Sequence, residues 1–107
     1  TTAGLNAYDP KDGAKKWSYE WKFPVKPLRT VGSSVIVGDL IVLPSGDGDG
    51  SRNMIGVRLP RGDQKPSLAW QLDATTPYVP TSLVRDDHLY TIFDDGIALC
   101  REAATGK

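Results

Sequence analysis

The densest run of side chains that could do chemistry lies between residues 47 and 53. Asp47, Asp49, Ser51 and Asn53 carry oxygen atoms at alternate positions, as the ligands of calcium-binding loops do. The twelfth position counted from Asp47 is Arg58, where an EF-hand loop has a bidentate glutamate, and no helical pattern flanks the run. These residues therefore favour a Gly- and Asp-rich loop between strands, with calcium binding as the weaker hypothesis.

The other reactive side chains stand alone in the sequence. His88 is the only histidine and follows Asp86 and Asp87. Without a nearby Ser or Cys nucleophile it predicts a half-exposed strand residue and no catalytic triad. Cys100 is the only cysteine, which excludes an intrachain disulfide and a CxxC site. Its alternating apolar neighbours predict a buried thiol.

Two short motifs are also better explained by turns than by chemistry. Asp94 and Asp95 could form a carboxylate pair, but adjacent strand residues point to opposite faces, and both precede Gly96 as turn residues do. Arg61-Gly62-Asp63 matches the integrin-binding tripeptide, which in three residues carries little information. No phosphate-binding glycine loop is present.

The composition suits one small domain and excludes several classes of partner. The chain has 107 residues, with 13 basic and 13 acidic side chains and a formal net charge of zero. No excess charge is available to attract nucleic acid or an anionic membrane surface. The apolar runs are only a few residues long, so no membrane span is predicted.

The elements that must position these residues are short strands. Trp17, Tyr19, Trp21 and Phe23 alternate with polar residues, which places the four aromatic rings on one face of an extended segment. Two hairpins are predicted, one turning at Gly38-Asp39 and one at Asp86-Asp87. Further strands are expected over 5–8, 54–59, 67–72 and 97–101, and no window has the helical period.

The strands repeat along the chain. A shift of 49 places residue 40 on 89 and aligns Ser33 with Ser82 and Val35 with Val84. A shift of 93 aligns residues 7, 9 and 13 with 100, 102 and 106. A unit of about 45–50 residues with four strands is the size of one β-propeller blade.

A family resemblance follows from the repeated motif. Residues 7–17 read Ala-x-Asp-x-x-Asp-Gly-x-x-x-Trp, which resembles the tryptophan-docking motif A-x-D-x-x-T-G-x-x-x-W of propellers of the pyrroloquinoline quinone (PQQ)-like type. Residues 100–107 resemble a second copy, with Cys and Glu in the first two motif positions, and residues 56–70 a stretched copy. The resemblance implies a structural docking motif formed by these positions: Ala7, Asp9, Gly13, Trp17, Gly62, Trp70, Cys100, Glu102 and Gly106.

The resemblance implies an all-β fold, namely part of a β-propeller with antiparallel four-stranded blades. Residues 1–107 are expected to form a single partial propeller domain. Residues 1–23 would end one blade, 30–72 would form a complete blade, and 78–107 would form most of the next. In the family each indole packs on the turn of the following motif, so Trp17 is expected near Gly62 and Trp70 near Gly106.

Two functions from different classes are compatible with this resemblance. The first is a non-catalytic scaffold or protein-interaction module, similar to the outer-membrane assembly lipoproteins, in an extracytoplasmic, for example periplasmic, bacterial protein. Its partners would be neighbouring blades and another protein bound through the loops at one rim. The alternative is part of a quinoprotein dehydrogenase that oxidises alcohols or sugars with PQQ and calcium. No catalytic, cofactor or complete metal constellation of that kind is evident in these residues.

Overall fold

The computed structural model describes residues 4–107, and within this range the chain is built from strands without a helix. The strands are β1 (Leu5–Tyr8), β2 (Lys15–Tyr19), β3 (Val35–Val37), β4 (Leu40–Gly46), β5 (Arg52–Arg58), β6 (Ser67–Leu72), β7 (Leu83–Arg85), β8 (His88–Ile92) and β9 (Ala98–Glu102). Residues 1–3 of the predicted first blade lie outside the described residues. Nothing within 4–107 forms a helix that could cross a membrane.

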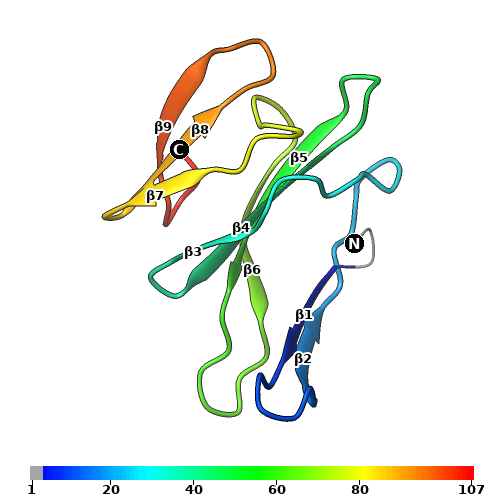
Figure 1. Ribbon diagram of the computed structural model, residues 1–107, viewed down its shortest axis with the longest axis vertical. Helices are drawn as coiled ribbons and strands as arrows, with labels where there is room; N and C mark the ends of the chain where they lie inside the picture. The colour runs from blue at the N-terminus through cyan, green and yellow to red at the C-terminus, as the bar shows by residue number, and fades with distance from the viewer. Residues whose placement is uncertain (1–3) are drawn as a thin grey trace.

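The strands form three separate antiparallel sheets, β1-β2, β3-β4-β5-β6 and β7-β8-β9 (Figure 1). Each sheet is a continuous stretch of chain, and the sheets follow one another as successive propeller blades do. The predicted all-β fold is therefore confirmed. Both hairpins turn at the predicted residues, because Val37 pairs with Leu40 and Arg85 with His88.

The second hairpin of the central sheet is longer than its sequence indicates. Strands β4 and β5 pair as far as Gly46 and Arg52, although Pro44, Ser45 and Gly46 are turn-forming residue types. The physical reason is a contact from outside the sheet. Arg29 and Gly46 exchange two backbone hydrogen bonds of 2.9 Å each, which continues the ladder on the other edge of β4. The connecting loop is therefore reduced to residues 47–51.

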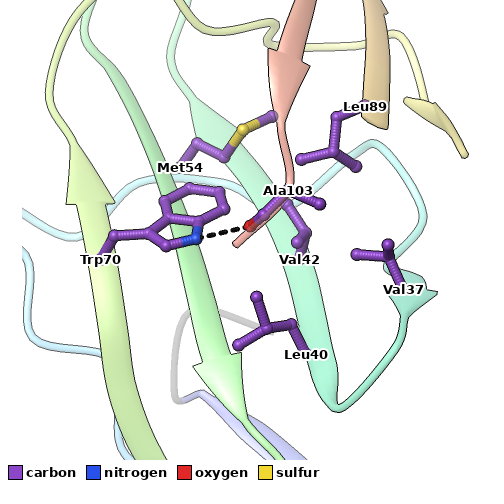
Figure 2. Close-up of a cluster of buried hydrophobic side chains, with 7 residues drawn as sticks. All are labelled: Val37, Leu40, Val42, Met54, Trp70, Leu89 and Ala103. Atoms are coloured by element: carbon purple, nitrogen blue, oxygen red, sulfur yellow. Dashed lines mark hydrogen bonds between the residues drawn. The ribbon is translucent and has the colours of Figure 1, made fainter. Parts of the chain in front are cut away.

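Two apolar cores lie on the two faces of the central sheet. One contains Val37, Leu40, Val42, Met54, Trp70, Leu89 and Ala103, and joins the central sheet to β7-β8-β9 (Figure 2). The other contains Leu5, Trp21, Leu43, Ile55 and Val57, and joins it to β1-β2. Because side chains alternate along a strand, β4 and β5 supply both cores at once.

The aromatic alternation between residues 17 and 23 is only partly a strand. Strand β2 ends at Tyr19, and Trp21 and Phe23 lie in the following link, where their rings stack with centroids 4.8 Å apart. All four aromatic side chains still pack against the same core. The shared face was thus predicted, while the length of the strand was not.

The structure also corrects the register of the internal repeat. The two hairpin turns superpose with a shift of 48, which aligns Leu40 with His88 and Val42 with Tyr90. A change of one residue exchanges the two faces of a strand. The corrected register explains why Leu89 and Thr91 are buried against the central sheet, whereas Tyr90 and Ile92 face outward.

Candidate functional site

The links between blades and two hairpin loops gather at one end of the sheets, which we call the loop end. It consists of residues 20–34, 47–51, 73–82 and 93–97 and lies toward the top of Figure 1. The opposite end carries the turns at 9–14, 38–39, 59–66, 86–87 and 103–107. Loops on a rigid β scaffold are the usual place for binding residues, so the loop end is the candidate site.

At the centre of the loop end, Lys26 joins two carboxylates of the 47–51 loop. Its Nζ lies 2.6 Å from Asp49 Oδ2 and 3.2 Å from Asp47 Oδ2. The pKa of Lys26 is raised, first by Asp49 and then by Asp47. Lys26 in turn is the main cause of the lowered pKa of Asp49. Asp47 also has a lowered pKa, first because of the Gly48 amide and then because of Lys26. The three groups therefore stay charged at neutral pH.

A second polar chain runs from the link 20–34 into the central sheet. The indole Nε1 of Trp21 donates to Asn53 Oδ1 at 3.0 Å, and Asn53 Nδ2 donates to Asp73 Oδ1 at 2.6 Å. Trp21 and Asn53 are almost completely buried, so a hydrogen bond between them removes the cost of two unpaired polar groups. These bonds fix the link 20–34 against β5 and the beginning of the next link.

Arg52 joins the 47–51 loop to the following sheet. Its Nη1 donates to the carbonyl oxygens of Asp47 and Ser51 at 2.8 and 3.0 Å. Its Nη2 lies 3.0 Å from Asp94 Oδ2, and its guanidinium carbon is 5.1 Å from the centroid of the Tyr78 ring. One planar cation with five donors can make all these contacts together. The loops of two blades are thereby held as one surface.

The four residues that formed the weaker calcium hypothesis do not converge on one point. The carboxylates of Asp47 and Asp49 face Lys26, while Asn53 belongs to β5 and accepts from Trp21. Within 4–107, no three His, Cys, Asp or Glu side chains are grouped as metal ligands. This arrangement does not fit a calcium ion, because an ammonium group already neutralises the two carboxylates.

We therefore expect the chain to bind no calcium with micromolar affinity. Calcium would have to displace Lys26 from two charge-assisted hydrogen bonds and would still lack a bidentate ligand. Isothermal titration calorimetry measures this directly. Saturable micromolar binding that disappears in the Asp47→Ala and Asp49→Ala variants would contradict the expectation.

The copy of the motif at residues 7–17 and the copy at residues 100–107 form the same turn. In the first, Asp9 N donates to Ala14 O and Gly13 N to Asp9 O, both at 2.8 Å. In the second, Glu102 N donates to Lys107 O at 2.7 Å and Gly106 N to Glu102 O at 2.8 Å. Gly13 and Gly106 have φ of 73° and 74°, which glycine adopts at little cost.

The structure places Trp70 on the turn of the second copy. A β carbon added to Gly106 would lie 3.0 Å from the ring carbons of Trp70, and one added to Gly56 would collide with the ring. Its Nε1 donates to the carbonyl oxygen of Ala103 at 2.9 Å (Figure 2). The indole therefore occupies a slot between two glycines and ties β6 to the following sheet. The need for a glycine at position 56 was not recognised from sequence.

Trp17 is placed differently from the expectation. A β carbon added to Gly62 would have no atom within 4 Å, so no indole lies on that turn as Trp70 lies on Gly106. Trp17 pairs with Ala7 across β1 and β2 and is partly buried against the core of Leu5, Trp21 and Val57. The insertion in residues 59–66 moves Gly62 to an exposed hairpin tip. Trp21, which the sequence placed on the shared aromatic face but not in the docking motif, is the more deeply buried indole at this junction.

The expectation of a buried Cys100 is wrong. Its side chain is exposed on β9, opposite Tyr90 on β8. It is the positional equivalent of Gly56, whose face of the central sheet is covered by β7-β8-β9. The corresponding face of β7-β8-β9 carries no cover within the described residues, so the same motif position is exposed there.

The remaining candidate residues lie apart from one another. His88 is exposed at the start of β8, opposite Glu102. Asp94 pairs with Arg52, while Asp95 Oδ1 accepts from the Ile97 amide as a turn residue does. Arg61 lies 3.1 Å from Asp39 at the end opposite to the loop end.

Comparison with known proteins agrees with this geometry. Residues 2–69, more than half of the chain, match the PQQ-like family model described as outer membrane protein assembly factor BamB. No curated protein matches the chain. Together with the consecutive antiparallel sheets and the repeated motif turn, the match shows that the chain belongs to the PQQ-like β-propeller family of the outer membrane protein assembly factor BamB.

Proposed function

We propose that this chain is a non-catalytic part of a β-propeller, which serves as a scaffold and binds another protein through its loop end. We further propose that it works outside the cytoplasm of a bacterium, as the family description suggests. In this proposal the segment needs no cofactor of its own. The single observation that carries the proposal is the polar network that holds the loops of successive blades together.

The network supports binding because it prepares a surface in advance. Lys26 fixes the 47–51 loop from one link, and Arg52 joins that loop to Asp94 and Tyr78 of the next blade. A partner would not have to order these loops, so the entropic cost of association is reduced. Apolar side chains stand free beside the network, since Val25 is 93% and Val79 52% exposed.

A second surface fits a neighbouring blade of the same propeller. The outer face of β7-β8-β9 exposes Leu83, Tyr90 and Ile92. In the central sheet, the positions equivalent to Tyr90 and Ile92 are Val42 and Pro44, and both are buried. We propose that another blade covers this face in the assembled protein, as β7-β8-β9 covers the central sheet.

Site-specific photo-crosslinking in the bacterial host tests the proposed role of the loop end. A photoreactive amino acid at Val25 or at Val79 is expected to give the same discrete adduct with another protein. The matched control is Gln64, which is exposed at the opposite end and is expected to give no such adduct. The Lys26→Glu variant is expected to weaken the adduct, because it removes the cation that fixes the 47–51 loop.

Two results would count against the proposal. One is an equally strong adduct from Gln64, which would place the partner at the other end. The other is the absence of any adduct from both loop positions in a correctly folded, correctly located protein.

A further inference from the structure

A cavity at the loop end lies where the central sheet meets β7-β8-β9. It is formed by the beginning of β5, the link 73–82 and the turn between β8 and β9. Its lining combines the apolar side chains of Phe93 and Ile97 and the hydroxyl of Thr76 with the carboxylates of Asp94 and Asp95, and it also includes the basic Arg52.

Thr76 places an unpaired polar group in the lining of this cavity. The residue is only 4% exposed, and its hydroxyl has no hydrogen-bond partner among the described residues. Buried hydroxyl groups are nearly always paired in folded proteins. An unpaired one in the lining of a cavity can form a further hydrogen bond with a polar group that enters the cavity.

The acidic groups of the cavity indicate the charge that a ligand would carry. Asp94 is neutralised by Arg52 at 3.0 Å. Asp95 accepts one backbone hydrogen bond from Ile97 through Oδ1, and no cation of the described chain pairs with it. The free carboxylate oxygen of Asp95 therefore favours a cationic donor.

The preceding blade junction shows how this chain satisfies the carboxylate equivalent to Asp95, because the shift of 48 aligns Asp47 with Asp95. There the link 20–34 has 15 residues and delivers Lys26 to Asp47 and Asp49. The corresponding link 73–82 has 10 residues and contains no basic residue. When the two links are aligned from the hairpins that follow them, with the shift of 48, Ala74 occupies the position of Lys26. The second junction thus has an acidic turn without a cation from its own link, and among the carboxylates of the described residues Arg52 of β5 pairs with Asp94 only.

We propose that this cavity binds a lysine or arginine side chain of the partner protein. This inference rests on the proposed function, because it specifies which kind of partner residue the loop end recognises. The aliphatic part of such a side chain would lie along Phe93 and Ile97, as long basic side chains cover apolar surface. The charged head would donate to Asp95 and to the hydroxyl of Thr76. Specificity at the loop end is then set by one basic residue of the partner.

The test measures peptide binding to the immobilised 107-residue chain by surface plasmon resonance. The probe is acetyl-Gly-Gly-Arg-Gly-Gly-amide, and its control is the same peptide with neutral citrulline in place of arginine. We expect saturable binding of the arginine peptide and at least about tenfold weaker binding of the citrulline peptide, because a charge-assisted hydrogen bond is lost. The Asp95→Asn variant is expected to bind the arginine peptide more weakly than the unmodified chain does, by about the same factor.

Two further variants separate the site from general electrostatic attraction. Asp86→Asn removes an exposed carboxylate at the opposite end and is expected to leave the affinity unchanged. Ala74→Lys introduces a cation where the preceding junction has Lys26, and is expected to abolish binding by occupying Asp95. Tryptophan fluorescence of each variant checks that the chain is folded.

Several outcomes overturn the inference. These are equal affinity for the arginine and citrulline peptides, no saturable binding of either peptide, or binding that survives both Asp95→Asn and Ala74→Lys. If crosslinking from Val25 and Val79 succeeds while the peptide test fails, the proposed function stands and the basic-residue inference is wrong. If the peptide binds but no crosslinked partner exists, the proposed function is wrong.

Discussion

Replacing Trp70 by alanine is expected to lower the free energy of unfolding by about 3–5 kcal/mol, the range found when large buried aromatic side chains are removed. Trp70 is 9% exposed and packs with Met54, Val42 and Ala103 in the core between two sheets. Its ring fills the slot between Gly56 and Gly106. Backbone on both sides prevents the slot from collapsing, so the cavity left by alanine should persist.

Urea denaturation followed by far-ultraviolet circular dichroism measures this effect, since the signal comes mainly from the backbone and remains measurable when the indole is removed. The measurement is made at several protein concentrations, so that self-association is recognised. Trp70→Phe retains most of the apolar area but loses the hydrogen bond to Ala103, and is expected to cost less than Trp70→Ala. Trp17→Ala is the matched control at the other junction, where the indole is only partly buried.

The docking interpretation predicts a clear order among these variants. Trp70→Ala should be the most destabilising, and Trp17→Ala should cost clearly less. A loss below about 1 kcal/mol for Trp70→Ala would place it among ordinary surface substitutions. That result would show that the indole is not what joins the two blades.

Local patterns in the sequence were sufficient to locate the strands and the two tight hairpin turns, but not the extent of β2, β4 and β5. Alternation and turn residues identify the turns at Gly38-Asp39 and Asp86-Asp87, because these signals act within a few residues. The motif also brought Trp70 to Gly106, since both positions belong to a repeated unit. The repeat register was harder to establish, because matches of residue type could not distinguish a shift of 48 from one of 49, whereas backbone pairing does.

What could not be predicted depends on contacts between distant segments. Lys26 reaches Asp47 and Asp49 across the link between two blades. The residues next to Lys26 do not indicate which carboxylates it will contact, and the residues next to Asp47 and Asp49 do not indicate Lys26. The exposure of Cys100 depends on which sheet lies against β9, which no alternation pattern reports. Gly56 could be explained only after Trp70 was seen to lie over it. The loop end is therefore a product of tertiary structure, although the loop around residues 47–53 and the turn at Asp94-Asp95-Gly96 were predicted from sequence.

The second large effect is expected in solution: the 107-residue chain prepared on its own should self-associate at tens of micromolar. The reason is the outer face of β7-β8-β9, where Leu83 is 69%, Ile92 55% and Tyr90 44% exposed. The free energy cost of exposed apolar surface is about 25 cal/mol per Å². The zero net charge provides little repulsion to oppose contact between copies.

Sedimentation velocity over a range of concentrations decides this prediction. A double variant, Tyr90→Lys with Ile92→Lys, places two charges on the outer face and is expected to shift the population toward monomer. Ile36→Lys is the matched control, because Ile36 is 63% exposed but lies on β3, away from that face. If both variants act equally, net charge alone controls association.

If the unmodified chain is a monodisperse monomer that unfolds cooperatively above about 60 °C, it is more stable than most mesophilic domains. The outer face would then need no cover, and the proposal that a neighbouring blade covers it would lose its energetic basis.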